Sequence, residues 1–275
     1  MIDLHCHSVY SDGLDTPEIL LSHALEAQLT CLALTDHDTV AGVQRLQDAA
    51  KSHSIQIITG VELSTRWKKY DIHIIGLNID CAHPVLHALL EKHKTQRVLR
   101  AQAIGERLHG HGIENAYQKA CVVAGHEHIG RPHFAQVLIQ EGKVPDFKAA
   151  FLRFLGQGRL AYVPTQWSAL DEAVRVIVEA GGQAVIAHPL KYGLTRTKLF
   201  ELIQAFKAAG GVGFEVVSGE MTPVQILEAA GLCARFQLLA SSGSDYHGQT
   251  LSRRGLGRQA QLPVNCPSLW ETWTC

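Results

Sequence analysis

The feature that most constrains the fold is an alternation of short apolar runs with helical patterns. Apolar runs lie at 2–4, 31–34, 55–58 and 73–77, and again at 184–187, 212–217 and 238–242. Helical patterns fall between most of them; one starts after Thr16, a residue type that caps helices, with Pro17 in the first helical position. Strands that alternate with helices are typical of a mostly parallel sheet or barrel. We therefore expect an α/β fold.

The alternation stops between about residues 80 and 158. This stretch contains helical patterns at 84–108, 132–141 and 146–154, with no strand signal between them. We interpret it as a small helical insertion, 80–158, that covers the active-site cleft. The α/β barrel domain would then consist of residues 1–79 and 159–275. The C-terminal segment 263–275 holds two of the four tryptophans and is expected to pack back onto that domain.

The bulk properties exclude several classes of protein. The net charge of the 275 residues is −1, so no global basic field attracts nucleic acid or a membrane surface. No apolar stretch is long enough to span a bilayer, and the N-terminus lacks the pattern of a signal peptide. The seven cysteines are scattered and include no C-x-x-C pair, which favours reduced thiols and a cytoplasmic location. No obligate protein partner is evident.

Metal-ligand residue types recur where the predicted strands end. His5 and His7 follow the first run at a spacing of two, which points both side chains to one face of a strand. In an α/β barrel, functional residues collect at the carboxyl ends of the strands and in the loops that follow. His73 is the exception, because it lies at the start of its run. The full set is His5, His7, Asp12, His37, Glu62, His73, His188, Asp245 and His247.

Each of these residues alone has an ordinary alternative. A single histidine after a strand is more often a hydrogen-bonding or capping residue, and a carboxylate there is usually solvated. The joint pattern argues against these alternatives, because independent accidents would not all fall at one rim. Six imidazoles with three carboxylates suit manganese, zinc or iron better than calcium or magnesium. Glu62 has two carboxylate oxygens with which to bridge two ions.

Six segments of the chain resemble, in order, the motifs of the PHP (polymerase and histidinol phosphatase) family of metal-dependent phosphoesterases. They are IDLHCHSVYSDG, LALTDHD, GVELS, HIIGL, AVIAHP and SSGSDYH. Two further stretches, GRPHFA and YVPTQW, are similar to the subgroup that acts on nucleoside 3',5'-bisphosphates and includes 5'-to-3' exoribonucleases. The resemblance implies a distorted seven-stranded barrel with a helical insertion and two or three divalent ions, often manganese.

The resemblance also implies how the ligands are shared among three metal sites. His5, His7, Glu62 and Asp245 match one site, and Glu62, His73 and His188 match a second. Asp12, His37 and His247 match a third, although several family members have a histidine in place of Asp12. Glu62, His188, Asp245 and His247 are the residues expected to take a catalytic part.

Substrate phosphates need cations outside this cluster. Arg131 and His133 follow Gly130 where a helix begins, and a helix N-terminus offers N–H groups to an anion. Arg97 and Arg100 share a helix face with Lys94. A solvated helix face is the ordinary alternative for that run, and an exposed arginine is the alternative for Arg131. We expect Arg131, His133, Arg97 and Arg100 to bind substrate phosphates.

The predicted activity is a metal-dependent phosphoester hydrolysis. A metal-bound hydroxide would remove the 5'-phosphate from nucleoside 3',5'-bisphosphates and trim short 5'-phosphorylated RNA in the 5'-to-3' direction. The general acid stays open among His247, His37 and a metal-bound water, and Asp36 is expected to orient a ligand histidine. The alternatives are a metal-dependent amidohydrolase, which has no need of Arg131, and a non-catalytic metal-binding module, which would not need all nine ligand positions.

Overall fold

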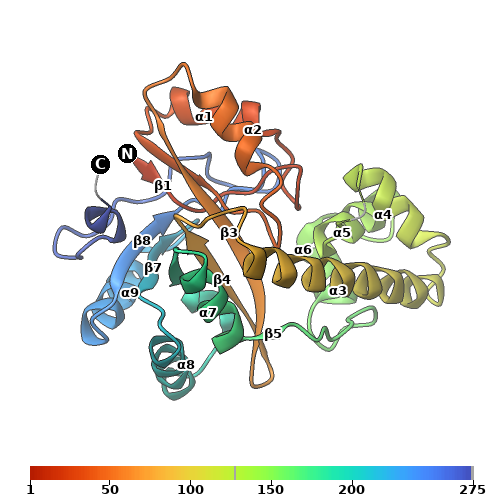
Figure 1. Ribbon diagram of the computed structural model, residues 1–275. Coiled ribbons are helices and arrows are strands. Elements are labelled where there is room, and N and C mark those ends of the chain that lie inside the picture. Colours follow the sequence, from red (N-terminus) through yellow and green to blue (C-terminus); the bar gives the residue numbers. More distant parts are fainter. Residues whose placement is uncertain (127, 274–275) are drawn as a thin grey trace. The chain divides into compact units, whose positions relative to one another are not determined.

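The structure, a computed structural model, describes residues 1–126 and 128–273 (Figure 1). The chain forms two compact units. The barrel unit comprises Met1–Leu90 and Trp167–Cys275, and the helical unit comprises Glu91–Gln166. Both boundaries lie further along the chain than the sequence indicates. The first does so because Leu86, Leu89 and Leu90 pack in the core of the barrel unit.

The sheet of the barrel unit follows the order β1-β2-β3-β4-β6-β7-β8, and the short β5 pairs with β3. The Leu4 amide donates to the Ser242 carbonyl at 3.0 Å, which brings the first strand beside the last. The sheet is therefore a nearly closed seven-stranded barrel, as the sequence predicts. The strands are β1 (Ile2–Asp3), β2 (Cys31–Leu34), β3 (Gln56–Trp67), β4 (Tyr70–Leu77), β5 (Ser168–Ala169), β6 (Gln183–Ile186), β7 (Gly213–Ser218) and β8 (Leu239–Gly243).

One strand breaks the parallel pattern. β4 is antiparallel to both β3 and β6, whereas the other pairs are parallel. A two-residue loop, Lys68-Lys69, joins β3 to β4. Such a loop can connect only antiparallel strands, because a parallel pair needs a long crossover. β3 also continues to Trp67, well beyond the apolar run 55–58 that marks it in the sequence.

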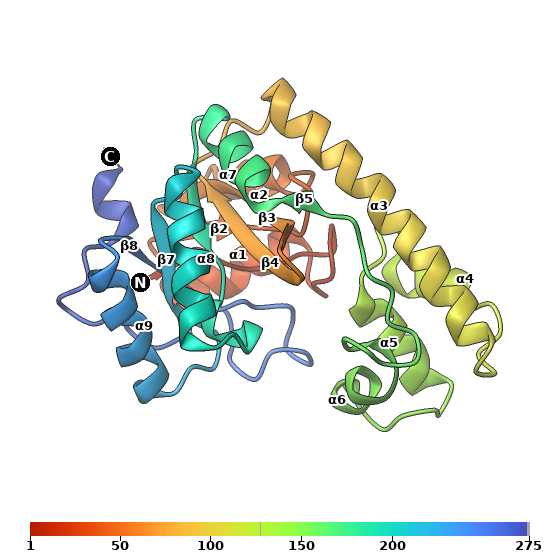
Figure 2. The ribbon, with the colours of Figure 1, turned by 90° about the horizontal axis from the view of Figure 1, so that it is seen from below.

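Helices cover the outside of the barrel (Figures 1 and 2). Threonines cap three of them: the hydroxyls of Thr16, Thr195 and Thr222 each accept a hydrogen bond from a first-turn amide. Along β6 the side chains alternate, so that Ala184 and Ile186 pack toward the helices. The helices are α1 (Pro17–Glu26), α2 (Val43–Ala50), α7 (Leu170–Glu179), α8 (Arg196–Ala208) and α9 (Pro223–Arg235), with a short 3-10 turn at Pro189–Tyr192.

The opposite face of the sheet forms a separate apolar core. Leu4, Ile58, Ile75 and Val185 meet there, and so does Leu269 from the C-terminal segment. The predicted packing of this segment onto the barrel is therefore confirmed. A 3-10 turn at Leu269–Thr272 presents the side chain, and Ser268 pairs with Ala240 beside it.

The helical unit has its own core, which includes Ile104, Leu108, Phe134, Leu138 and Phe154. The sequence indicates three of its helices but misses α4, which is short and begins at Asn115 without a side-chain cap. Its elements are α3 (Pro84–His109, which begins in the barrel unit), α4 (Ala116–Ala124), α5 (Arg131–Gln140), α6 (Phe147–Ala150) and a π-helical turn (Phe151–Leu155). No helix among the described residues is long and apolar enough to cross a membrane.

The buried position of Leu269 generates a prediction about stability. Leu269→Ala should lower the free energy of unfolding by about 2–5 kcal/mol, because it leaves a cavity in the barrel core. Urea denaturation followed by circular dichroism measures this change. Val264→Ala is the control, since Val264 is 100% exposed in the same segment. Equal stability of the two variants would show that the tail does not contribute to the core.

Candidate metal centre

All nine ligand-type residues come together in the barrel unit. Each belongs to one of four groups whose candidate ligand atoms lie within 4.8 Å of one another. The groups are His5, His7 and Asp245; His5, Glu62 and His188; His37, Glu62 and His73; and His7, Asp12, His37 and His247. Because the groups share members, they form one continuous cluster with several places for a cation.

The direction of β4 explains the unusual position of His73. The residue lies near the start of its strand, and Glu62 lies in the middle of the long strand β3, whereas the other candidates lie in loops that follow strands. Since β4 runs antiparallel to its neighbours, its beginning lies at the rim where the parallel strands end. The register pairs His73 with Ser64 of β3, so His73 and Glu62 share one face of the sheet.

Glu62 lies at the centre of the cluster and is fully buried. Its Oε1 is 3.0 Å from His73 Nδ1 and 2.9 Å from His188 Nε2. Its Oε2 is 3.0 Å from His37 Nδ1 and 3.3 Å from the Nε2 atoms of both His5 and His7. The two oxygens therefore face different sets of imidazoles, as a carboxylate that bridges two ions would.

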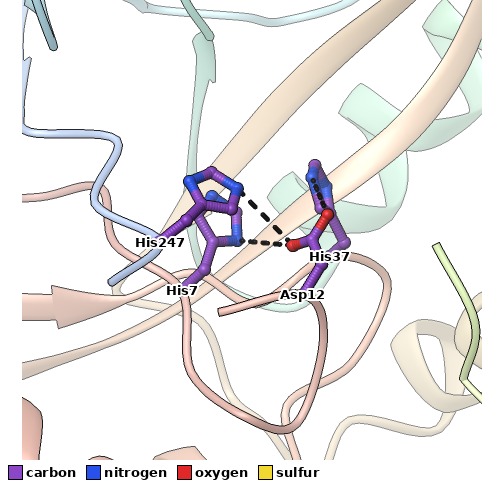
Figure 3. A group of neighbouring side chains, drawn as sticks. All are labelled: His7, Asp12, His37 and His247. Atoms are coloured by element: carbon purple, nitrogen blue, oxygen red, sulfur yellow. Dashed lines mark ion pairs between the residues drawn. The ribbon is translucent and has the colours of Figure 1, made fainter. Parts of the chain in front are cut away.

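A second carboxylate organises the outer part of the cluster (Figure 3). Asp12 Oδ1 is 3.9 Å from His7 Nδ1 and 3.5 Å from His247 Nε2, and Asp12 Oδ2 is 3.8 Å from His37 Nε2. The rings of His7 and His247 stack with their centroids 4.0 Å apart. These separations are longer than hydrogen bonds, and they leave the ring nitrogens and carboxylate oxygens facing a common space.

The donor atoms of the cluster fit a cation better than they fit one another. Glu62 Oε2 makes no hydrogen bond within the described residues, although three ring nitrogens lie within 3.3 Å. His5 Nε2 and His7 Nε2 also face each other at 3.2 Å. Buried polar atoms normally have partners, so donor atoms arranged in this way fit divalent ions held by nitrogen and oxygen.

Burial and neighbouring charges shift the pKa values of His5 and His7 in opposite directions. Burial lowers the pKa of His7 to about 3, with help from the charge of His247. Burial alone would also lower the pKa of His5, but the carboxylates of Glu215, Glu62 and Asp245 raise it well above its usual value. His7 is consequently neutral at physiological pH, which keeps its ring nitrogens available to a cation.

Asp36 is a buried carboxylate that is not among the nine ligand-type residues, and it holds one of the loops that carry those residues. Asp36 accepts hydrogen bonds from the Ser8 amide and from the hydroxyls of Ser8 and Ser11 at 2.6–2.7 Å. It therefore holds the loop between His7 and Asp12 and does not orient a histidine ring, contrary to the prediction. Burial raises the pKa of Asp36, and the serine hydrogen bonds oppose that shift.

Glu215 of β7 is a buried carboxylate at the centre that sequence reasoning missed. It is 0% exposed, and its Oε1 lies 2.9 Å from His5 Nδ1. Its Oε2 accepts from the backbone amide of His188. An Nδ1–H that donates to Glu215 leaves the His5 Nε2 lone pair directed at Glu62. The only signal in the sequence is a charged residue inside the apolar run 212–217.

The backbone is strained at two of the predicted ligands. His188 has φ 29° and Asp245 has φ 52°, both in the region that non-glycine residues rarely occupy. Gly243 is required nearby, because a Cβ there would lie 2.2 Å from His5 Cβ. Lys191, also missed in the sequence, donates to Asp245 Oδ2 at 2.5 Å, while Asp245 Oδ1 faces His5 and His7 at 3.5 Å.

The predicted phosphate-binding residues all belong to the helical unit. Arg131 and His133 lie in the first turn of α5, and the Gly130 amide donates to His133 Nδ1 at 2.9 Å. Arg97 and Arg100 of α3 are 4% and 6% exposed, so they do not lie on a solvated face. The role of these residues in phosphate binding stays a prediction.

Comparison with known proteins places these observations in a family. A model of the PHP domain matches residues 3–102. The chain is 45% identical to a 5'-3' exoribonuclease from Haemophilus influenzae, over 98% of this chain and 97% of that protein. It is 40% identical to a 3',5'-nucleoside bisphosphate phosphatase from Chromobacterium violaceum, over 98% of this chain and 95% of that protein.

Solved structures share the fold. A protein from Chromobacterium violaceum, described as an amidohydrolase with bound sulfate and no metal, has a TM-score of 0.94 and 40% identity, with 98% and 94% of the two chains covered. A putative metal-dependent phosphoesterase from Bifidobacterium adolescentis has a TM-score of 0.82 and 27% identity, with 98% and 92% covered.

The contacts of Glu215 lead to a prediction about metal affinity. Glu215→Gln keeps the shape of the side chain but removes the charge and weakens the hold on His5. We expect divalent-ion affinity to fall by about 10–100-fold in a folded protein, as measured by competition with a chromogenic chelator. Glu220→Gln, a change at an exposed site, is the control. Unchanged affinity in the Glu215 variant would mean that this carboxylate does not act on the metal centre.

Proposed function

Since the chain belongs to the PHP domain family, we propose that it is a phosphoesterase that removes the 5'-phosphate from nucleoside 3',5'-bisphosphates. We propose that it also trims 5'-phosphorylated RNA in the 5'-to-3' direction. The observation that carries the proposal is the convergence of nine ligand-type side chains around the buried carboxylate of Glu62. Relatives of almost the same length with these two activities support the choice of substrate.

Two or three divalent ions would be held by this cluster, with manganese as the proposed native metal and zinc or iron as alternatives. The mixture of imidazole and carboxylate donors supports these metals. We assign Glu62, with its two differently directed oxygens, as the shared ligand. Ions bound there supply an activated water and neutralise the charge of the phosphoryl oxygens.

The orientation of the His247 ring defines which of its nitrogen atoms can take part in proton transfer. His247 Nδ1 lies 2.9 Å from the backbone oxygen of Asp245, so Nδ1–H donates there and Nε2 is directed toward Asp12. The same contact fixes the ring of His247 beside that of His7. Glu62, His188 and Asp245 hold the reacting groups in place, and His247 remains our candidate for the proton that the leaving group needs.

Substrate phosphates outside the metal centre are assigned to Arg131, His133, Arg97 and Arg100. His133 accepts the Gly130 amide at Nδ1, which makes Nε2 the protonated nitrogen of its neutral ring. Together with Arg131 at the start of α5, this arrangement is suited to an anion. A bisphosphate offers such an anion in its 3'-phosphate, and RNA offers it in the next phosphodiester.

An amidohydrolase is the second candidate, because a solved structure with 40% identity is described as one. The cation-rich helical unit favours a phosphorylated substrate, and the sulfate bound to that neighbour is a tetrahedral anion like phosphate. For the partners we propose a small nucleotide or an RNA 5' end. We also propose a cytoplasmic location, because no disulfide joins the six cysteines among the described residues.

The proposal predicts selective phosphate release. Manganese-loaded protein should release inorganic phosphate from adenosine 3',5'-bisphosphate much faster than from 5'-AMP, since only the bisphosphate has the 3'-phosphate that anchors it. A malachite-green assay measures the release, and excess EDTA should abolish it. Equal rates on both nucleotides would contradict the anchoring role, and hydrolysis of cyclic amides without phosphate release would favour the second candidate.

A further prediction concerns His7, whose ring faces Glu62, Asp12 and Asp245. His7→Ala should lower kcat/KM for the bisphosphate by more than about 100-fold, since loss of a ligand should exceed loss of an outer partner. Circular dichroism would verify that the variant is folded. His53→Ala, at an exposed loop histidine, is the matched control. Full activity of folded His7→Ala protein would contradict the assignment.

A further inference from the structure

A basic surface borders the metal centre on the barrel unit. Segments 66–71 and 191–201 together carry six cations and two carboxylates, although the net charge of the whole chain is −1. Positive charge is therefore concentrated in two short stretches, and its side chains are exposed or partly exposed. We name five of these cations the basic arc: Lys68, Lys69, Lys191, Arg196 and Lys198.

The arc begins at the metal centre. Lys191 Nζ donates to Asp245 Oδ2 at 2.5 Å, while the other oxygen of Asp245 faces His5 and His7. Lys191 lies in the 3-10 turn that follows His188, and α8 begins soon after at Arg196. The first turn of α8 therefore continues from the same rim of the barrel.

The far end of the arc is the tip of the β3–β4 hairpin, which extends beyond the neighbouring strands (Figure 1). Lys69 is four residues from His73 along β4. A strand rises by about 3.3 Å per residue, so the hairpin tip lies about 13 Å from His73 and beyond the metal centre. Glu201 accepts from both Lys68 and Lys198, which ties the hairpin to the first turn of α8. The two segments thus form one connected surface.

The hairpin tip has an unusual backbone conformation at one of its two lysines. Lys68 has φ 54° in a two-residue loop, where glycine, asparagine and aspartate are preferred because they tolerate this conformation. Lysine at this position strains the backbone. The Lys68 side chain is 52% exposed, and its ammonium group pairs with Glu201.

The aromatic residues of the hairpin are not available to stack on bases. Trp67 is only 8% exposed and packs in the barrel core, and Tyr70 stacks on it with the ring centroids 6.1 Å apart. The surface thus offers ammonium and guanidinium groups without an exposed aromatic platform. Such a surface recognises phosphates rather than bases.

We propose that the basic arc binds the phosphodiester backbone of a single RNA strand whose 5' end lies at the metal centre. This inference rests on the proposed function for the position of the 5' end. Binding along the arc is independent of base sequence and weakens with salt, because each phosphate contact releases a counterion. The hairpin end of the arc, Lys68 and Lys69, does not contribute to binding of a mononucleotide, which ends before the hairpin.

Lys68→Gly/Lys69→Asn tests the proposal, because glycine suits the positive φ of the first loop position while both charges are removed. The ligand is a 5'-phosphorylated RNA decamer labelled at its 3' end, and its anisotropy is measured in EDTA, where hydrolysis does not occur. We expect Kd to rise at least tenfold and the slope of log K against log[salt] to become shallower by about 1.4. The melting temperature should not fall.

The control is Lys51→Asn/Arg175→Gln, which removes two exposed charges outside the arc, and Arg196→Gln is a second test at its α8 end. Hydrolysis of adenosine 3',5'-bisphosphate by manganese-loaded Lys68→Gly/Lys69→Asn protein should stay within twofold of wild type. An unchanged RNA Kd, no salt-dependent RNA binding by wild type, or an equal loss on the bisphosphate would overturn the proposal. Absence of bisphosphate hydrolysis in wild type would instead overturn the proposed function, since RNA binding is read without catalysis.

Discussion

The structure depends on a buried negative charge at the end of the barrel. Glu62 is fully buried, and five imidazoles from four different segments of the chain surround its two oxygens. Burying a carboxylate is costly unless it is paired, so its surroundings must supply compensating charge. Among the surrounding imidazoles, the pKa of His5 is raised well above its usual value by neighbouring carboxylates, which outweigh its burial, and bound cations would compensate the charge of Glu62 more strongly. This one requirement explains why so many histidines converge at the rim.

Barrel closure and buried hydrogen bonds bring these imidazoles to one place. Asp3 accepts from the Ser244 and Gly257 amides, which joins the start of the chain to the loop that carries Asp245. Asp36 holds the loop after β1 in a similar way. Glu215 then connects His5 to the backbone of His188 across the barrel. The ligand set is thus supported by carboxylates that do not themselves face the candidate cation sites.

Much of this arrangement could be predicted from the sequence, and the exceptions have physical reasons. The ligand residues other than His73 could be predicted because each follows a short apolar run, and parallel strands bring their carboxyl ends to one rim. The antiparallel course of β4 was not readable, since neither lysine of its two-residue loop is typical of a tight hairpin. Glu215 and Lys191 could not be predicted as part of the site, because a single charged residue forms no periodic pattern. Their partners lie on distant segments of the chain and become known only from the structure. For the same reason the sequence assigned Asp36 to a histidine when its partners are serines.

The proposed function depends most on Glu62, whose two carboxylate oxygens would each hold a divalent ion. Anomalous diffraction from crystals of the manganese-loaded protein tests it directly, because it locates manganese without reference to activity. We expect at least two strong peaks, of which two lie about 3.5–4 Å apart, one beside each oxygen of Glu62. A single ion, or ions that Glu62 does not contact, would contradict the account.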